Sequence, residues 1–307
     1  MDPLLFDPNP KNADLSFDSR MRAGLERLWV IFRPYADEHF VVSIRDAEER
    51  TRRFGTAGPE RDKAFYDFYQ RYWEMRLGCE LLARNLTLVP MANRPKSGPD
   101  FLVDLGSKRA WIECVSPGPG MGADSVPDPH YESDGSEITY MPEDEIKLRL
   151  LAALNEKHKQ LFKHTECGIV QNHDAYIVAI NGHSISPLIT VDHDPPRIAR
   201  VLLGVGQLAV AWNSRTGFND QVHYHQQPHV TKRSQAQVSS EPFWMSKYSA
   251  ISGVLYSDCD GINEFNPSRS KWIYVQNPLA TTVMASGWIK ECECWTADPK
   301  TRTVSRQ

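Results

Sequence analysis

Two carboxylates stand at matching places on two predicted neighbouring strands. Asp100 begins the extended run 100–105, and Glu113 lies inside the run 110–115. Because side chains alternate along a strand, adjacent strands can hold these two acids side by side on one face. Clustered carboxylates repel one another unless a hard divalent cation lies between them. The spacing therefore predicts a site for Mg²⁺ or Mn²⁺, which would activate water and neutralise charge on a phosphate.

Two polar residues on predicted helices are expected to face the same site. Glu74 interrupts an otherwise apolar helical run. Lys157 lies in the middle of a later amphipathic helix, about 20° around the axis from the core-facing Ile146. A lysine that points at a sheet is costly without a partner, and the acid cluster would supply one. Gln160, three residues further on, would support the lysine or a water.

These residues, in this order, resemble the motif of the PD-(D/E)XK nuclease superfamily, in which a helix glutamate precedes Pro-Asp on one strand and Glu-x-Lys on the next. The matching residues are Glu74, Pro99-Asp100 and Glu113-Cys114-Val115. The resemblance covers residues 61–181 and leaves both flanks unexplained. It implies a restriction-endonuclease-like fold and hydrolysis of DNA phosphodiester bonds, in restriction, defence or DNA processing, with RNA left open as a substrate.

The resemblance also implies a set of metal ligands and exposes one departure from the motif. Asp100, Glu113 and the Cys114 backbone carbonyl would bind the metal, with Glu74 reaching it directly or through water. Val115 stands where the family has its lysine, so Lys157 would orient the attacking water and stabilise the charged transition state. Many nucleases of this type cut two strands as dimers, so a homodimer is also an expectation.

A catalytically inactive nuclease-fold domain that binds nucleic acid or a protein partner is the alternative. The missing lysine at position 115 favours it. A separate alternative concerns the residues alone: Glu74, Asp100 and Glu113 form separate structural salt bridges or turn caps. Lys157 then pairs with an acid at the surface, its stem lying along the edge of the apolar stripe.

The elements that position these residues are expected to follow the order helix, three strands, helix, strand. This pattern predicts an α/β fold, with a mixed β-sheet flanked by helices and the core order αβββαβ. Residues 1–60 would form an N-terminal helical extension, and 61–307 a nuclease-like domain with its core at 61–181. The remainder, 182–307, would elaborate the sheet through runs at 203–212, 251–256 and 271–276.

Composition excludes several classes of protein. Hydrophobic residues make up 41% of the 307 and charged residues 24%, which is typical of a globular protein and not of a disordered chain or a coiled coil. With 35 Lys and Arg against 39 Asp and Glu, the formal charge is −4, so any electrostatic partner must contact a local patch. No secretory signal or membrane-length apolar run is readable, which predicts a cytoplasmic protein without membrane contact.

Three further segments carry residues whose types could serve a function. His223, His225 and His229 could ligate a transition metal, but their polar surroundings favour a solvated loop. The segment 117–141 carries five acids and no Lys or Arg, which is typical of a lid over the site or of a surface loop. The helix spanning 145–164 carries a formal charge of +3 before its histidines are counted, and it is the predicted place of DNA contact.

Overall fold

The computed structural model describes residue 5 and residues 19–53, 59–127, 141–185, 194–213, 215, 217–258 and 272–307. The helices are α1 (Ser19–Phe32), α2 (Phe40–Arg53), α3 (Pro59–Ala83), α4 (Glu143–Glu166) and α5 (Arg197–Leu203), with short 3₁₀ turns η1 (Met91–Asn93), η2 (His183–Ile185), η3 (Pro242–Trp244) and η4 (Ser246–Tyr248). The strands are β1 (Thr87–Leu88), β2 (Phe101–Asp104), β3 (Arg109–Val115), β4 (Ala175–Asn181), β5 (Val205–Asn213), β6 (Gly217–Gln226), β7 (His229–Thr231), β8 (Gln237–Ser239), β9 (Gly253–Ser257), β10 (Ile273–Gln276), β11 (Glu293–Ala297) and β12 (Val304–Arg306).

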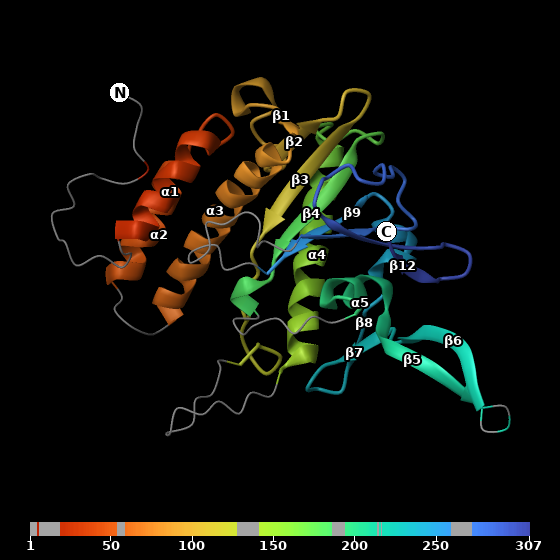
Figure 1. Cartoon of the computed structure of the whole chain (residues 1–307). Helices are drawn as coiled ribbons and strands as arrows, with labels where there is room; N and C mark the ends of the chain where they lie inside the picture. The colour runs from red at the N-terminus through yellow and green to blue at the C-terminus, as the bar shows by residue number, and fades with distance from the viewer. Residues whose placement is uncertain are drawn as a thin grey trace.

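An eight-stranded mixed sheet forms the centre of the molecule, in the order β1-β2-β3-β4-β9-β10-β11-β12 (Figure 1). Strands β3, β4 and β9 run parallel, whereas β2 is antiparallel to β3. Parallel neighbours need a crossover connection, and α4 provides it between β3 and β4. The predicted mixed α/β architecture with flanking helices is thus confirmed, as is the order of elements from α3 to β4.

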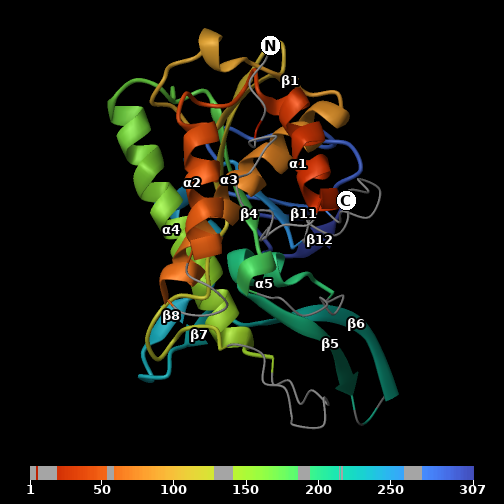
Figure 2. The same cartoon turned by 90° about the vertical axis from the view of Figure 1, so that its left-hand side faces the viewer.

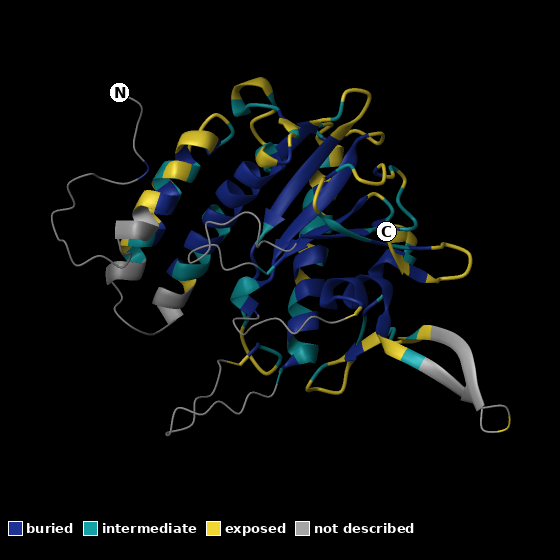
Figure 3. Ribbon diagram, in the orientation of Figure 1, coloured by how far each residue is buried: buried dark blue, intermediate teal, exposed yellow. Residues whose placement is uncertain are grey.

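Helices cover both faces of the sheet. On one face α3 packs against the strands and carries α1 and α2 as an outer layer, which Figure 2 shows from the front. On the other face lie α4 and α5. Figure 3 shows that α3 and the central strands are buried along most of their length. Gly78 permits the close packing of α1 on α3, because a Cβ atom there would lie 2.7 Å from the Phe32 ring.

One predicted strand lies outside the central sheet. The run 203–212 was expected to widen that sheet, but it forms β5, which pairs antiparallel with β6 in a separate two-stranded ribbon. Pairing with the next segment of chain closes a short loop, which costs less entropy than joining a distant sheet edge. The runs 251–256 and 271–276 do join the sheet as β9 and β10, and both are interior strands. None of the described helices is long and apolar enough to cross a membrane.

Candidate functional site

Asp100 and Glu113 lie at the same end of the β2–β3 pair. The antiparallel register places Phe101 opposite Ile112, and continuing it by one residue places Asp100 opposite Glu113. Asp100 Oδ2 accepts a hydrogen bond of 2.6 Å from the Cys114 backbone N–H, which fixes this carboxylate beside β3. The alternation of side chains along two strands thus brings the two acids together.

Lys157 reaches the same place from α4. Its Nζ donates a hydrogen bond of 2.8 Å to Glu113 Oε1 and one of 3.0 Å to Gln160 Oε1. The lysine and glutamate side chains expose only 11% and 10% of their surface. Lys157 therefore points at the sheet, and the interpretation that it pairs with an acid at the surface is wrong. The predicted core-facing stripe beside it is buried: Ile146, Leu150, Leu154 and Leu161.

Glu74 reaches the site from α3. Its carboxylate accepts hydrogen bonds of 2.8 Å from Arg71 Nη1 and 3.0 Å from Gln70 Nε2. The Gln70 amide also donates to the Cys114 carbonyl at 3.4 Å and accepts from the Ser116 N–H at 2.8 Å. Gln70 thus connects α3 to the end of β3 and contacts two of the oxygen groups predicted to bind metal.

Burial and mutual repulsion raise the pKa values of both glutamates. Burial, together with the Asp100 charge, raises the pKa of Glu74 to about 7, and Arg71 offsets this only in part. Burial and Asp100 likewise raise the pKa of Glu113 to about 8, against the effect of Lys157. Burial alone would lower the pKa of Lys157, but the Glu113 carboxylate raises it overall, so the ammonium is charged at neutral pH. Acids that oppose one another's ionisation in this way form one electrostatic cluster.

His164 belongs to this cluster, although the sequence reasoning missed it. Its Nε2 lies 3.8 Å from Glu113 Oε2, and burial lowers its pKa against the effect of the Asp100 charge. The available signal was helical spacing, because positions 157, 160 and 164 fall on one face of a helix. The same reasoning would have found Gln70, which precedes Glu74 by four residues on α3.

Arg94 fixes the backbone around Asp100, and nothing in the sequence pattern indicated it. Its Nη1 donates to the carbonyl of Pro99 at 2.8 Å and to the carbonyl of Asp100. Its Nη2 donates to the Tyr35 carbonyl at 3.1 Å, in the turn between α1 and α2. The N-terminal helical extension is therefore bonded to the segment that presents Asp100.

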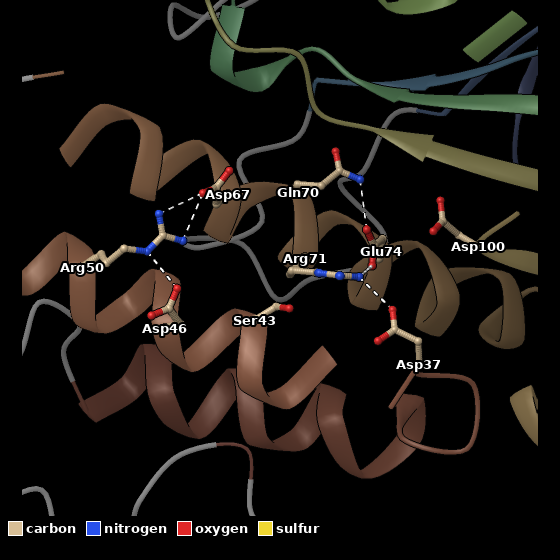
Figure 4. Close-up of a pocket in the computed structure, with 9 residues that line it drawn as sticks. All are labelled: Asp37, Ser43, Asp46, Arg50, Asp67, Gln70, Arg71, Glu74 and Asp100. Atoms are coloured by element: carbon tan, nitrogen blue, oxygen red, sulfur yellow. Dashed lines mark hydrogen bonds and ion pairs between the residues drawn. The ribbon is translucent and has the colours of Figure 1, made fainter. Parts of the chain in front are cut away.

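A polar cavity of about 510 Å³ lies between α2 and α3, with Asp100 at one end (Figure 4). Its lining residues are Asp37, Ser43, Asp46, Arg50, Asp67, Gln70, Arg71, Glu74 and Asp100. Two arginines stand among five acids. Arg50 bonds Asp46 and Asp67, and Arg71 bonds Asp37 and Glu74. This negative formal charge disfavours phosphate and favours cations.

The donor atoms around Asp100 suit a hard divalent ion, but their present contacts are with other side chains. Carboxylate and carbonyl oxygens are the ligands that Mg²⁺ prefers, and a cation would relieve the repulsion among the three acids. As they stand, Glu74 is held by Arg71 and Glu113 by Lys157. Within the described ranges, no three His, Cys, Asp or Glu side chains are grouped closely enough to hold a metal ion.

The remaining candidate residues do not join this site. His223 and His225 are exposed on β6, and His229 is exposed on β7. The predicted solvent exposure is confirmed, but the predicted loop is wrong, because the chain pairs with β5 as far as Gln226 and His229 pairs with Ser239 of β8. Most of the acidic segment 117–141 falls in 128–140, outside the described residues.

Comparisons with protein-family models, curated proteins and solved structures gave no match for this chain. Its function is therefore inferred from the side chains around Asp100 and from the elements that position them. Two acid–cation pairs stand out: Glu113 with Lys157, in which both side chains are largely buried, and Glu74 with Arg71, in which the arginine is partly exposed.

Proposed function

We propose that the chain is a metal-dependent endonuclease of the PD-(D/E)XK superfamily, with a restriction-endonuclease-like fold, that hydrolyses phosphodiester bonds in DNA. The observation that carries the proposal is the 2.8 Å contact between Lys157 Nζ and Glu113 Oε1. It supplies an amine from α4 where Val115 leaves the motif without one. The element order from α3 to β4 and the mixed sheet support the fold assignment.

The residues present fit a divalent ion in their chemistry. Asp100, Glu113, Glu74 and the Cys114 carbonyl would hold Mg²⁺ or Mn²⁺. When bound, the ion supplies charge neutralisation and activation of water. Asp100 is held in place beforehand, since its side chain accepts from the Cys114 N–H and its carbonyl accepts from Arg94. Such preorganisation lowers the energy needed to assemble the site during reaction.

Lys157 has a hydrogen-bond donor left for the reaction. In phosphodiester hydrolysis a water oxygen forms a bond to phosphorus, and the bond from phosphorus to one ester oxygen breaks. Of the three ammonium donors, one contacts Glu113 and one contacts Gln160, and no described residue accepts the third. That donor would orient the water or stabilise negative charge on a phosphate oxygen, in a site where burial strengthens the interaction.

The charges around the site favour approach of nucleic acid along α4. Lys159 and Lys163 are exposed on this helix and form no ion pair with the described residues. Lys163 lies next to Gln160 on the helix surface, so the basic residues continue from the site outward. On the other side, the cavity between α2 and α3 carries five acids. A phosphate backbone is attracted to the first surface and repelled by the second.

The direct test is cleavage of plasmid DNA, linear duplex DNA, single-stranded DNA and RNA in the presence of Mg²⁺ or Mn²⁺. A pool of random-sequence DNA covers an enzyme that cuts only its own recognition site. We expect cleavage of DNA by the wild-type chain, and its loss in Asp100→Ala and in Glu113→Ala. Asp104→Ala is a matched control, because Asp104 is exposed at the far end of β2. Cleavage that persists in both site variants would overturn the proposal.

A nucleic-acid-binding or protein-interaction domain without catalysis is the second candidate, and Val115 is the observation that favours it. The two candidates differ in metal dependence. A binding domain would retain DNA or its protein partner equally well with Mg²⁺ or with a chelator, and it would leave every DNA in the pool intact. Lys157→Met would then alter binding no more than Lys159→Met does.

A further inference from the structure

Arg71 joins two carboxylates that belong to different parts of the molecule. Its Nη1 lies 2.8 Å from Glu74 Oε2, on α3, and 3.0 Å from Asp37 Oδ2, in the turn between α1 and α2. Its guanidinium carbon also lies 5.7 Å from the centre of the Phe40 ring, at the start of α2. Figure 4 shows Arg71 between the two acids, in the cavity that Asp100 also lines. One side chain thus links a predicted metal ligand to the N-terminal helical extension.

Arg71 can leave Glu74 without losing all its partners. After such a move, Asp37 and the face of the Phe40 ring would still compensate the guanidinium charge. The Arg71 side chain is also 24% exposed, so water reaches it. Glu74, in contrast, exposes only 9% of its side chain and needs a cation or hydrogen-bond donors when it is ionised. After the same move Glu74 would keep the 3.0 Å hydrogen bond from Gln70 Nε2 but would have no cationic partner among the described residues. The ion pair is therefore asymmetric, because the arginine has a second carboxylate, Asp37, whereas the glutamate would need another cation.

We propose that Arg71 competes with the divalent ion for Glu74 and passes to Asp37 alone when the ion binds. This inference rests on the proposed function, because it assumes an ion at Asp100 and Glu113. It makes Arg71 a positioning residue that weakens metal binding in the free protein. It also couples metal binding to the docking of the N-terminal helical extension, since the released guanidinium strengthens the contact with Asp37.

Calorimetric titration of the full chain with Mn²⁺ tests this competition without any substrate. We expect Arg71→Met to tighten Mn²⁺ binding by about tenfold, the size of effect produced by removing one charge-assisted hydrogen bond from a ligand. Asp37→Asn should act in the opposite direction and weaken binding by several-fold, because Arg71 then has Glu74 as its one remaining carboxylate. Because the two variants are expected to change the Mn²⁺ affinity in opposite directions, Asp37→Asn still tests the proposal if Arg71→Met fails to fold.

Matched variants separate this competition from the general electrostatic field. Arg50→Met and Asp46→Asn remove the same charges from the same cavity, but neither residue contacts Glu74. Both should change the Mn²⁺ affinity by less than the Arg71 and Asp37 variants do. In a Glu74→Gln background, Arg71→Met should have no further effect, since its target is already neutral.

The outcomes distinguish this inference from the proposed function. An Arg71→Met effect equal to that of Arg50→Met, or one that persists in the Glu74→Gln background, overturns the competition while leaving a metal site in place. Absence of Mn²⁺ binding in both wild type and Arg71→Met overturns the metal site and the competition together. Binding that appears only after Arg71→Met, and that Asp100→Asn then abolishes, supports both.

Discussion

The site has two sides, one formed by residues of α3 and the other by residues of α4. Each side pairs a glutamate with a cationic side chain, but the surroundings of the two pairs differ. On the α3 side, Arg71 contacts Glu74 and has Asp37 as a second carboxylate. On the α4 side, Lys157 contacts Glu113 as its one carboxylate in the described structure, and both side chains are about nine-tenths buried. Removing one partner of a buried ion pair of the second kind typically costs about 3–5 kcal/mol, because the other charge is left without compensation. We therefore expect the Arg71–Glu74 pair to open more readily than the Lys157–Glu113 pair.

Asp100 is common to both sides, so its removal should have the largest effect. Its charge raises the pKa of both glutamates, and its carboxylate is fixed by the Cys114 N–H. We expect Asp100→Asn to weaken Mn²⁺ binding by more than about 100-fold, beyond the loss typical of residues behind the ligands. Calorimetry measures this, with Asp104→Asn as the control. Equal affinities in the two variants would mean that the two sides do not share an ion.

Substitution of Lys157 should affect the rate of cleavage, whereas substitution of Arg71 should affect metal binding. We expect Lys157→Met to lower the rate of DNA cleavage by about 10²–10³-fold, the effect of losing one preorganised donor, while Mn²⁺ binding is retained. Single-turnover cleavage at saturating Mn²⁺ isolates this effect from affinity, and Lys159→Met is the matched control. A rate unchanged by Lys157→Met would show that the Lys157–Glu113 pair is structural.

Stability of the metal-free protein should fall as pH rises, because the folded state raises the pKa of Glu74 to about 7 and of Glu113 to about 8 from 4.5. Between pH 4.5 and 8 the folded chain binds more protons than the unfolded chain, so raising the pH favours unfolding. We expect thermal denaturation to show a Tm lower by about 5 °C at pH 8 than at pH 5.

Glu113→Gln provides the comparison for this pH dependence, since it removes the group with the larger shift. Its Tm should decline less between pH 5 and pH 8 than that of the wild type, and added Mn²⁺ should restore stability only in the wild type. Parallel curves for the two proteins would show that Glu113 does not titrate in this window.

The smallest effect is expected from the exposed lysines of α4. Lys159→Gln and Lys163→Gln should each weaken DNA binding several-fold and reduce the slope of log affinity against log salt by about 1. Binding assays at several salt concentrations, with Ca²⁺ in place of Mg²⁺, measure this slope. Lys300→Gln is the control, because Lys300 is exposed in the turn between β11 and β12. Identical slopes in all three variants would place the DNA elsewhere.

Local periodicity predicted the part of the site that depends on a single strand or helix. Alternation along a strand placed Asp100 and Glu113 together, and the helical stripe around Leu154 placed Lys157 on the buried face. These inferences succeed because a period of 2 or 3.6 residues decides which face a side chain occupies. The same two periods also predicted the order of helices and strands.

Contacts that depend on tertiary packing were not predictable from these patterns. Arg94 donates hydrogen bonds to the backbone carbonyl groups of Tyr35 and Pro99. Every residue has a backbone carbonyl, so the residue types at these positions do not indicate the contact. The segment 205–213 has a strand sequence, but its partner is the neighbouring β6 instead of the central sheet. Partner choice depends on the relative cost of closing loops, which a local pattern does not record.

Anomalous scattering from Mn²⁺ in crystals of the full chain tests most directly whether the α3 and α4 sides form one metal-dependent site. We expect a peak within about 2.6 Å of oxygens from Asp100, Glu113 and the Cys114 carbonyl, with Arg71 separated from Glu74 and Lys157 still beside Glu113. A fully loaded crystal with no peak at Asp100, or with Arg71 still bound to a Glu74 that ligates the ion, would contradict this expectation.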